Sequence, residues 1–115
     1  SYEYWFTLGR LHSMVGDYEK AIEAFDFALT CDDSDTELKI LKAYCLYMNE
    51  SYEKAIEEYQ EIEGDEEVMR RISPLMAECY MKLEQLPTAF HDHKRSGYGG
   101  WADQLYQLYP LLYRD

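Results

Sequence analysis

The stretch Tyr18-Glu19-Lys20-Ala21-Ile22-Glu23 recurs letter for letter as Tyr52-Glu53-Lys54-Ala55-Ile56-Glu57, 34 residues further along the chain. After the same interval a weaker third copy follows, with Leu86, Ala89 and Phe90 at three of the matching positions. A fixed interval of this length is typical of proteins that stack one small supersecondary unit many times. The sequence therefore predicts repeated units that bury their apolar faces against one another.

Each copy contains two stretches with apolar residues at three- and four-residue spacing, separated by a short polar break, which is typical of two amphipathic helices. The expected helices cover residues 3–14, 18–30, 35–48, 52–62, 66–83 and 87–94. Small residues recur at one position of the first helix, as Gly9, Ala43 and Ala77, and would let the paired helices approach closely. Ser34 followed by Glu37 predicts a capping box at the start of the third helix.

This pattern resembles the tetratricopeptide repeat (TPR). The residues of the first copy that carry the resemblance are Trp5, Leu8, Gly9, Gly16, Tyr18, Ala21, Phe25 and Ala28. The second copy departs from the pattern at its start, where Lys39 and Lys42 replace bulky apolar residues. The resemblance implies an all-α, right-handed solenoid of three antiparallel helix pairs with a C-terminal capping helix. We expect a single TPR domain over residues 1–115, with repeats at about 3–34, 35–68 and 69–96 and a last helix at about 101–112.

A proline, Pro74, lies within the first helix expected of the third copy. Proline has no backbone N–H and removes one helical hydrogen bond. We therefore expect that helix either to kink at Pro74 or to begin at Ser73.

The composition narrows the classes of partner. The chain has 23 acidic and 11 basic residues, for a formal net charge of -12, which repels nucleic acid and anionic membrane surfaces. No apolar run is long enough to span a bilayer, and no signal peptide is recognisable. Three cysteines without a Cys-x-x-Cys pair favour a reducing compartment, the cytoplasm or nucleus. Because the chain begins at Ser1 rather than Met, we expect it to be a piece of a longer protein or to carry a cloning remnant.

No catalytic or cofactor-binding motif is found. The glycines at 97–100 are not followed by the lysine of a phosphate-binding loop. His91 and His93 are two residues apart and would point to opposite sides of a helix, so they could not chelate one metal ion. The acidic stretches at 31–35 and 63–67 lack the spacing of a calcium loop and are expected to cap helices. The sequence thus predicts no enzyme, no cofactor and no metal site.

In TPR proteins the first helix of each pair lines a concave surface, and the resemblance implies that its outward positions contact a bound peptide. The predicted protein-binding residues are Phe6, Arg10, Met14, Ile40, Tyr44, Tyr47, Met48, Glu78 and Met81. Aromatic and methionine side chains supply large, adaptable contact area, which favours an apolar or amphipathic partner segment. Alternatively, some of these side chains turn into the core between the helices.

The C-terminal stretch predicts a possible second interface. It consists of Trp101, Leu105, Tyr106, Tyr109 and Tyr113, and it carries little charge. This stretch either caps the last repeat or also meets a partner, including a second copy of the chain.

The functional hypothesis from the sequence is a non-enzymatic adaptor or scaffold that binds another protein. Two alternatives remain open at this stage. The small acidic chain with three repeats is also similar to type III secretion translocator chaperones. The second alternative is a self-associating TPR segment of a large assembly, such as a cell-cycle ubiquitin ligase.

Overall fold

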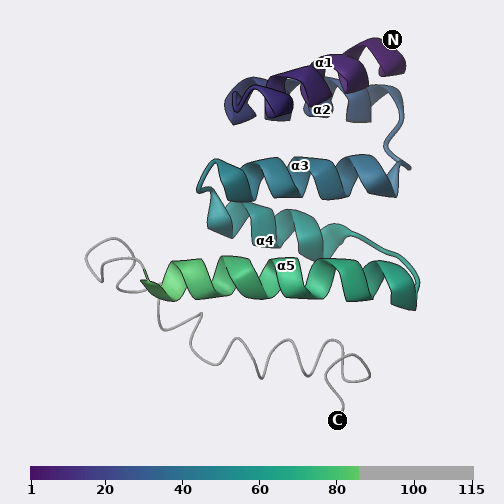
Figure 1. The fold of residues 1–115 in the computed structure, drawn as a ribbon. Coiled ribbons are helices and arrows are strands. Elements are labelled where there is room, and N and C mark those ends of the chain that lie inside the picture. Colours follow the sequence, from purple (N-terminus) through teal and green to yellow (C-terminus); the bar gives the residue numbers. More distant parts are fainter. Residues whose placement is uncertain (86–115) are drawn as a thin grey trace. The chain divides into compact units, whose positions relative to one another are not determined.

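A computed structural model describes residues 1–85, and within them it contains α-helices and no β-strand. The helices are α1 (Tyr2–Met14), α2 (Tyr18–Cys31), α3 (Thr36–Met48), α4 (Tyr52–Glu61) and α5 (Glu66–Gln85) (Figure 1). The chain divides into two compact units, Ser1–Glu63 and Gly64–Asp115. The all-α fold class and the positions of the first five predicted helices are confirmed.

Polar side chains define the helix starts. The Oδ1 atoms of Asp17 and Asp35 accept hydrogen bonds from backbone N–H groups three residues ahead, at Lys20 and Leu38. Such caps satisfy donors that the first helical turn leaves without a partner. The predicted capping box at Ser34 is wrong, because α3 begins one residue later and Asp35 is its cap. The Ser34 side chain instead donates to the carboxylate of Asp32, so it is not available to the helix.

The first helix pair, α1 with α2, is closed by a glycine facing an aromatic ring. A Cβ atom placed on Gly9 would lie 2.5 Å from the Phe25 ring, a distance that real Cβ atoms do not reach. Gly9 is buried and Phe25 is fully buried. The small residue at this position therefore lets the two helices approach, as the repeat pattern predicts.

A second layer of the core joins the two pairs of the first unit. Ala21, Phe25 and Ala28 of α2 form one buried cluster with Leu38 and Cys45 of α3. Removing this apolar surface from water is the main force that stacks α3 on α2.

The second pair, α3 with α4, keeps the buried columns of the first. Ala43, Ala55 and Tyr59 stand one repeat after Gly9, Ala21 and Phe25, and each of these three later residues is fully buried. The second pair thus has a small residue, an alanine and a ring at the same positions of the repeat as the first.

In the second unit, α5 runs without interruption through Pro74. The alternative that this helix begins at Ser73 is wrong. Asp65 starts the helix two turns earlier, because its Oδ1 accepts from the N–H of Val68 and its carbonyl accepts from the N–H of Met69. Just before the proline, the hydroxyl of Ser73 donates to the carbonyl of Met69 at 2.7 Å.

All three cysteines are free thiols. Cys45 and Cys79 are buried, and burial raises the pKa of Cys45 to about 11 and that of Cys79 to about 12. A thiol that stays protonated at neutral pH is a poor nucleophile and a poor metal ligand. These two residues therefore pack as small apolar groups, whereas Cys31 is exposed.

Several predictions lie outside the described residues: the helix at 87–94, His91 and His93, the glycines at 97–100, and the C-terminal stretch at 101–113. Within residues 1–85, no helix has the length and apolarity required to cross a bilayer. In the same part of the chain, histidines, cysteines and carboxylates do not gather in a group that could hold a metal ion.

Candidate functional site

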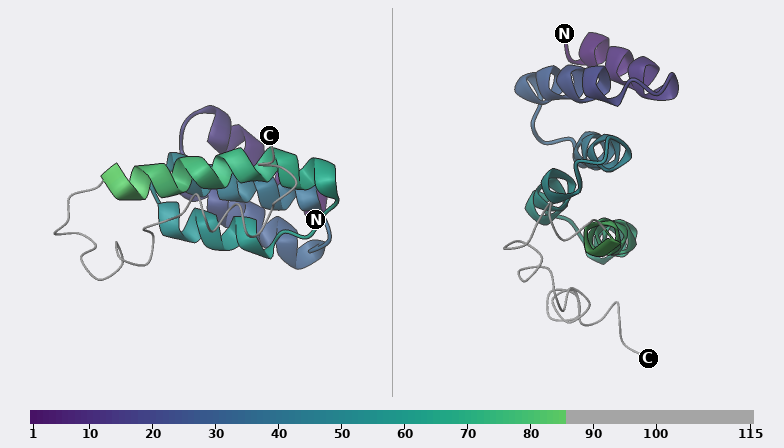
Figure 2. Two further views of the ribbon diagram at one scale, coloured as in Figure 1. Left: turned by 90° about the horizontal axis from the view of Figure 1, so that it is seen from below. Right: turned by 90° about the vertical axis from the view of Figure 1, so that its left-hand side faces the viewer.

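The first unit has two distinct sides. In the right-hand view of Figure 2, α1 and α3 lie on one side of this unit and α2 and α4 on the other. Arg10 and Met14 of α1 are exactly one repeat before Tyr44 and Met48 of α3, and all four side chains are exposed. Because these residues hold the same positions in the first helix of each pair, their side chains are expected to point to the same side. We call this surface of α1 and α3 the α1/α3 face.

On α1 the face is organised around the half-buried ring of Phe6. The ring lies 5.8 Å from that of Tyr2 and 6.2 Å from that of Phe25, between the surface and the core. The guanidinium carbon of Arg10 is 6.0 Å from the centre of the Phe6 ring, in the range of a cation–π contact. The guanidinium of Arg10 is thus held over the Phe6 ring, and its N–H groups are accessible to solvent.

On α3 the face is a cluster of tyrosines. The rings of Tyr44 and Tyr47 are 6.2 Å apart, and Tyr47 lies 5.7 Å from Tyr52 at the start of α4. Tyr44 is 43% exposed and Met48 is 38% exposed, while Tyr47 is half-buried. The accessible apolar surface of α3 is therefore carried mainly by Tyr44 and Met48.

One predicted binding residue of α3 does not reach this surface. Ile40 is only 6% exposed, so its side chain belongs to the core between the helices. The sequence allowed for this alternative, and Ile40 is left out of the site proposed below.

The remaining predicted residues fall elsewhere. Glu78 and Met81 are exposed on α5, in the second unit. Trp101, Leu105, Tyr106, Tyr109 and Tyr113 lie outside the described residues.

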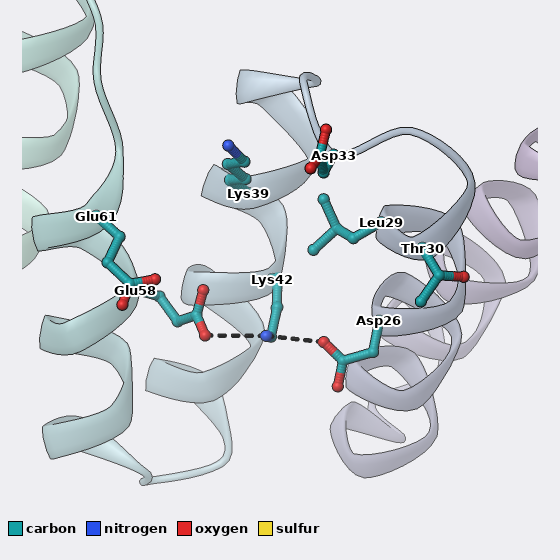
Figure 3. Close-up of a pocket in the computed structure, with 8 residues that line it drawn as sticks. All are labelled: Asp26, Leu29, Thr30, Asp33, Lys39, Lys42, Glu58 and Glu61. Carbon is teal, nitrogen blue, oxygen red and sulfur yellow. Dashed lines mark hydrogen bonds and ion pairs between the residues drawn. The ribbon is translucent and has the colours of Figure 1, made fainter.

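The opposite side of the first unit contains a pocket that the sequence reasoning did not identify. It has a volume of about 400 Å³ and lies between α2, α3 and α4 (Figure 3). Its charged lining residues are Asp26, Asp33, Lys39, Lys42, Glu58 and Glu61. The side chains of Leu29 and Thr30 complete the lining.

Lys42 bridges two helices across this pocket. Its Nζ is 2.7 Å from Oδ1 of Asp26 on α2 and 2.9 Å from Oε1 of Glu58 on α4 (Figure 3). Burial disfavours the charged ammonium, but the hydrogen bonds to the two carboxylates outweigh this effect, so the pKa of Lys42 is raised. The lysine therefore stays charged and ties the two helix pairs together at their surface.

A signal for the pocket is present in the repeat register. Lys39 and Lys42 stand where the first copy has Trp5 and Leu8, and this departure from the pattern is visible in the sequence. What the sequence alone did not show is that Asp26, from the preceding pair, meets Lys42.

Comparison with known proteins gives a family match. The family described as "Anaphase-promoting complex, cyclosome, subunit 3" matches residues 14–91, more than half of the chain. The chain belongs to this family. The resemblance to the TPR family is thereby confirmed, and this subunit 3 family is of the TPR type.

This chain is also similar to a curated protein, the general transcriptional corepressor ssn6 of Schizosaccharomyces pombe (strain 972 / ATCC 24843). The two are 27% identical over 96 residues, which cover 84% of this chain and 9% of the corepressor. The chain thus spans less than a tenth of the length of this relative.

The family match supports a coarse statement of function. TPR-type families are protein–protein interaction scaffolds, and they are typically non-catalytic. The partner has to be argued from the surfaces of this chain, because one fold carries many functions.

Proposed function

We propose that the chain is a non-catalytic adaptor that binds an apolar or amphipathic segment of a partner protein on the α1/α3 face. The observation that carries this proposal is the exposure of Met14, Tyr44 and Met48, which are 75%, 43% and 38% exposed at repeat-equivalent or adjacent positions. Exposed methionine and tyrosine side chains offer contact area that adapts to the shape of a helix or an extended peptide.

The charge of the chain indicates what flanks the apolar anchor. A formal charge of -12 attracts a cationic segment and speeds its association. Glu3 and Glu37 are exposed on the same helices as the apolar residues. A partner segment with an apolar centre and basic flanks fits this surface.

Affinity capture with a matched pair of variants tests the proposal. Tyr44→Ala with Met48→Ala removes apolar surface from the α1/α3 face. Phe27→Ala removes a side chain of α2 that is 49% exposed and does not belong to the α1/α3 face.

Quantitative mass spectrometry measures the amount of each captured protein. We expect the amount of a true partner to fall at least about tenfold with the Tyr44/Met48 variant only, because truncating the anchor residues of an interface has an effect of this size. Thermal unfolding of both variants checks that each is folded. Equal partner lists for the wild-type chain and the Tyr44/Met48 variant would exclude the α1/α3 face.

A second candidate function is favoured by the family match. The family description names a subunit of an assembly, which supports a structural role in a larger assembly. In this second proposal the C-terminal stretch from Trp101 to Tyr113 joins two copies of the chain. Sedimentation equilibrium over a wide concentration range tests it: Tyr109→Ser with Tyr113→Ser is expected to abolish a dimer formed by the full chain. A strict monomer before substitution would rule this role out. Neither the matched family nor the corepressor is described as a secretion chaperone, and that alternative is not proposed.

The compartment is also part of the proposal. Free thiols at all three cysteines and a transcriptional corepressor among the relatives support a cytoplasmic or nuclear location.

A further inference from the structure

The two helix pairs of the first unit differ at a point where the repeat pattern makes them equivalent. In the first pair, Trp5 of α1 stacks on Phe27 of α2 with ring centres 4.6 Å apart. One repeat later, the same two positions are held by Lys39 of α3 and Glu61 of α4, and both of these line the pocket. An apolar contact within one pair is thus replaced by opposite charges in the next.

A neighbouring pair of positions changes in the same way. Leu8 and Ala24 of the first pair correspond to Lys42 and Glu58 of the second. Lys42 and Glu58 form an ion pair at 2.9 Å, and Asp26 of the preceding pair adds a second carboxylate at 2.7 Å. Four apolar positions have therefore become charged together, and the pocket lies among the new side chains.

The charge in the pocket selects the ligand. Its lining holds four carboxylates and two lysines, a formal charge of -2. Two of the three N–H groups of Lys42 are already engaged. Within residues 1–85, the carboxylates of Asp33 and Glu61 have neither an ion pair nor a hydrogen bond. Of the charged lining residues without an ion pair in residues 1–85, two are carboxylates and one is the ammonium of Lys39, so the uncompensated charge is negative and favours a cation over an anion.

Within residues 1–85, the carboxylates of the lining do not form a site for a metal ion. In the described part of the chain, no three carboxylate, histidine or cysteine side chains are close enough to share a metal ion. A cation that spreads its charge over several donors suits this arrangement better. The guanidinium of arginine has five N–H donors in one plane, and its aliphatic stem can lie along an apolar wall such as Leu29.

We propose that the pocket between α2, α3 and α4 binds the guanidinium group of an arginine in a partner protein. Glu61 and Asp33 supply free acceptor oxygens, and the outer oxygens of Asp26 and Glu58 supply others. This site is on the side of the first unit opposite the α1/α3 face, so it is independent of the function proposed above.

A titration followed by ¹⁵N–¹H spectra of the full chain tests the proposal with three blocked tripeptides. The probe is acetyl-Gly-Arg-Gly-amide. The peptide with citrulline has the same shape without the charge, and the peptide with glutamate carries the opposite charge. With the arginine peptide we expect saturable shifts at the amides of Leu29, Thr30 and Glu61. The citrulline peptide is expected to bind at least about threefold more weakly, because it loses the contribution of a charged hydrogen bond.

Matched variants then locate the site. Glu61→Gln removes an acceptor without disturbing the ion pairs of Lys42, and it is expected to weaken binding of the arginine peptide about threefold or more. Glu57→Gln removes an exposed carboxylate of α4 that does not line the pocket, and it is expected to leave the affinity within error.

The outcomes are decisive in both directions. Saturable shifts that depend on Glu61 and on the charge of the peptide support the site. Absence of saturation, equal binding of citrulline, preferential binding of the glutamate peptide, or equal loss in Glu57→Gln and Glu61→Gln would overturn it. Each of these results leaves the α1/α3 face proposal untouched, because that proposal is tested by different residues.

Discussion

The two helix pairs of the first unit share one 34-residue pattern, yet their outer surfaces are stabilised by different interactions, apolar in one pair and ionic in the other. The α1–α2 pair is closed by the stack of Trp5 on Phe27, whereas the α3–α4 pair is tied to its neighbour by the ion pairs of Lys42. Their buried columns are nevertheless alike, with Phe25 and Tyr59 both fully buried. The buried columns therefore set the backbone of both pairs, while the outer positions are free to change from apolar to charged.

The largest expected effect comes from the buried column. Phe25→Ala is expected to lower the free energy of unfolding by about 3–5 kcal/mol, because it leaves a cavity between α1, α2 and α3. Phe27→Ala, on the same helix but 49% exposed, is expected to cost about 1 kcal/mol from the lost stack. Urea denaturation measures both, and similar losses would contradict the division into column and outer positions.

The close contact within the first pair is tested next. Gly9→Ala is expected to destabilise the protein by about 1–3 kcal/mol, because its new Cβ atom would overlap the Phe25 ring. Thr7→Ala, at an exposed position of the same helix, controls for helix propensity and is expected to have little effect. Since the second pair has Ala43 at the equivalent position, unchanged stability of Gly9→Ala would mean that both pairs have the same helix spacing.

The ion pairs of the second pair are expected to matter less. Lys42→Met leaves the carboxylates of Asp26 and Glu58 without their shared cation and is expected to cost about 1 kcal/mol. Lys39→Met lies in the same pocket, where residues 1–85 provide its side chain with no ion pair, and is expected to be near neutral.

The pH dependence sharpens this prediction. Because the folded pKa of Lys42 is raised above its ordinary value of 10.5, its contribution is complete below that pH and is lost as the pH rises through the folded pKa. The stability difference between the wild-type chain and Lys42→Met is therefore expected to shrink in alkali. A difference that grows with pH would contradict the bridging role.

The smallest effect concerns a contact between the two pairs. The hydroxyl of Tyr2 donates to Oδ2 of Asp35, and this hydrogen bond, with burial and the nearby carboxylates, raises the pKa of Tyr2 from 10.0 to about 12. The folded state therefore holds the proton more tightly, and stability is expected to fall as the pH rises from 10 to 12. Tyr2→Phe is expected to flatten the curve in this window, as measured by denaturation at several pH values. An unchanged slope would show that Tyr2 contributes nothing to it.

Much of the fold was predictable because its signals are local. Helix positions follow from apolar spacing along a few turns, and the 34-residue interval follows from comparing the chain with itself. The cap of α3 was misplaced by one residue because Ser34 and Asp35 are both good capping residues, and the competing bond from Ser34 to Asp32 was not visible in the pattern.

The helix pairs, their interval, the small and aromatic buried columns and the excess of negative charge all follow from the order of the residues alone. The burial of Ile40, the exposure of Tyr44 and the meeting of Asp26 and Glu58 at Lys42 depend on the packed structure. Spacing along a helix specifies a face, whereas exposure and ion pairing depend on how neighbouring helices are packed. Those distances join residues 16 positions apart on either side of Lys42, and no local pattern contains them.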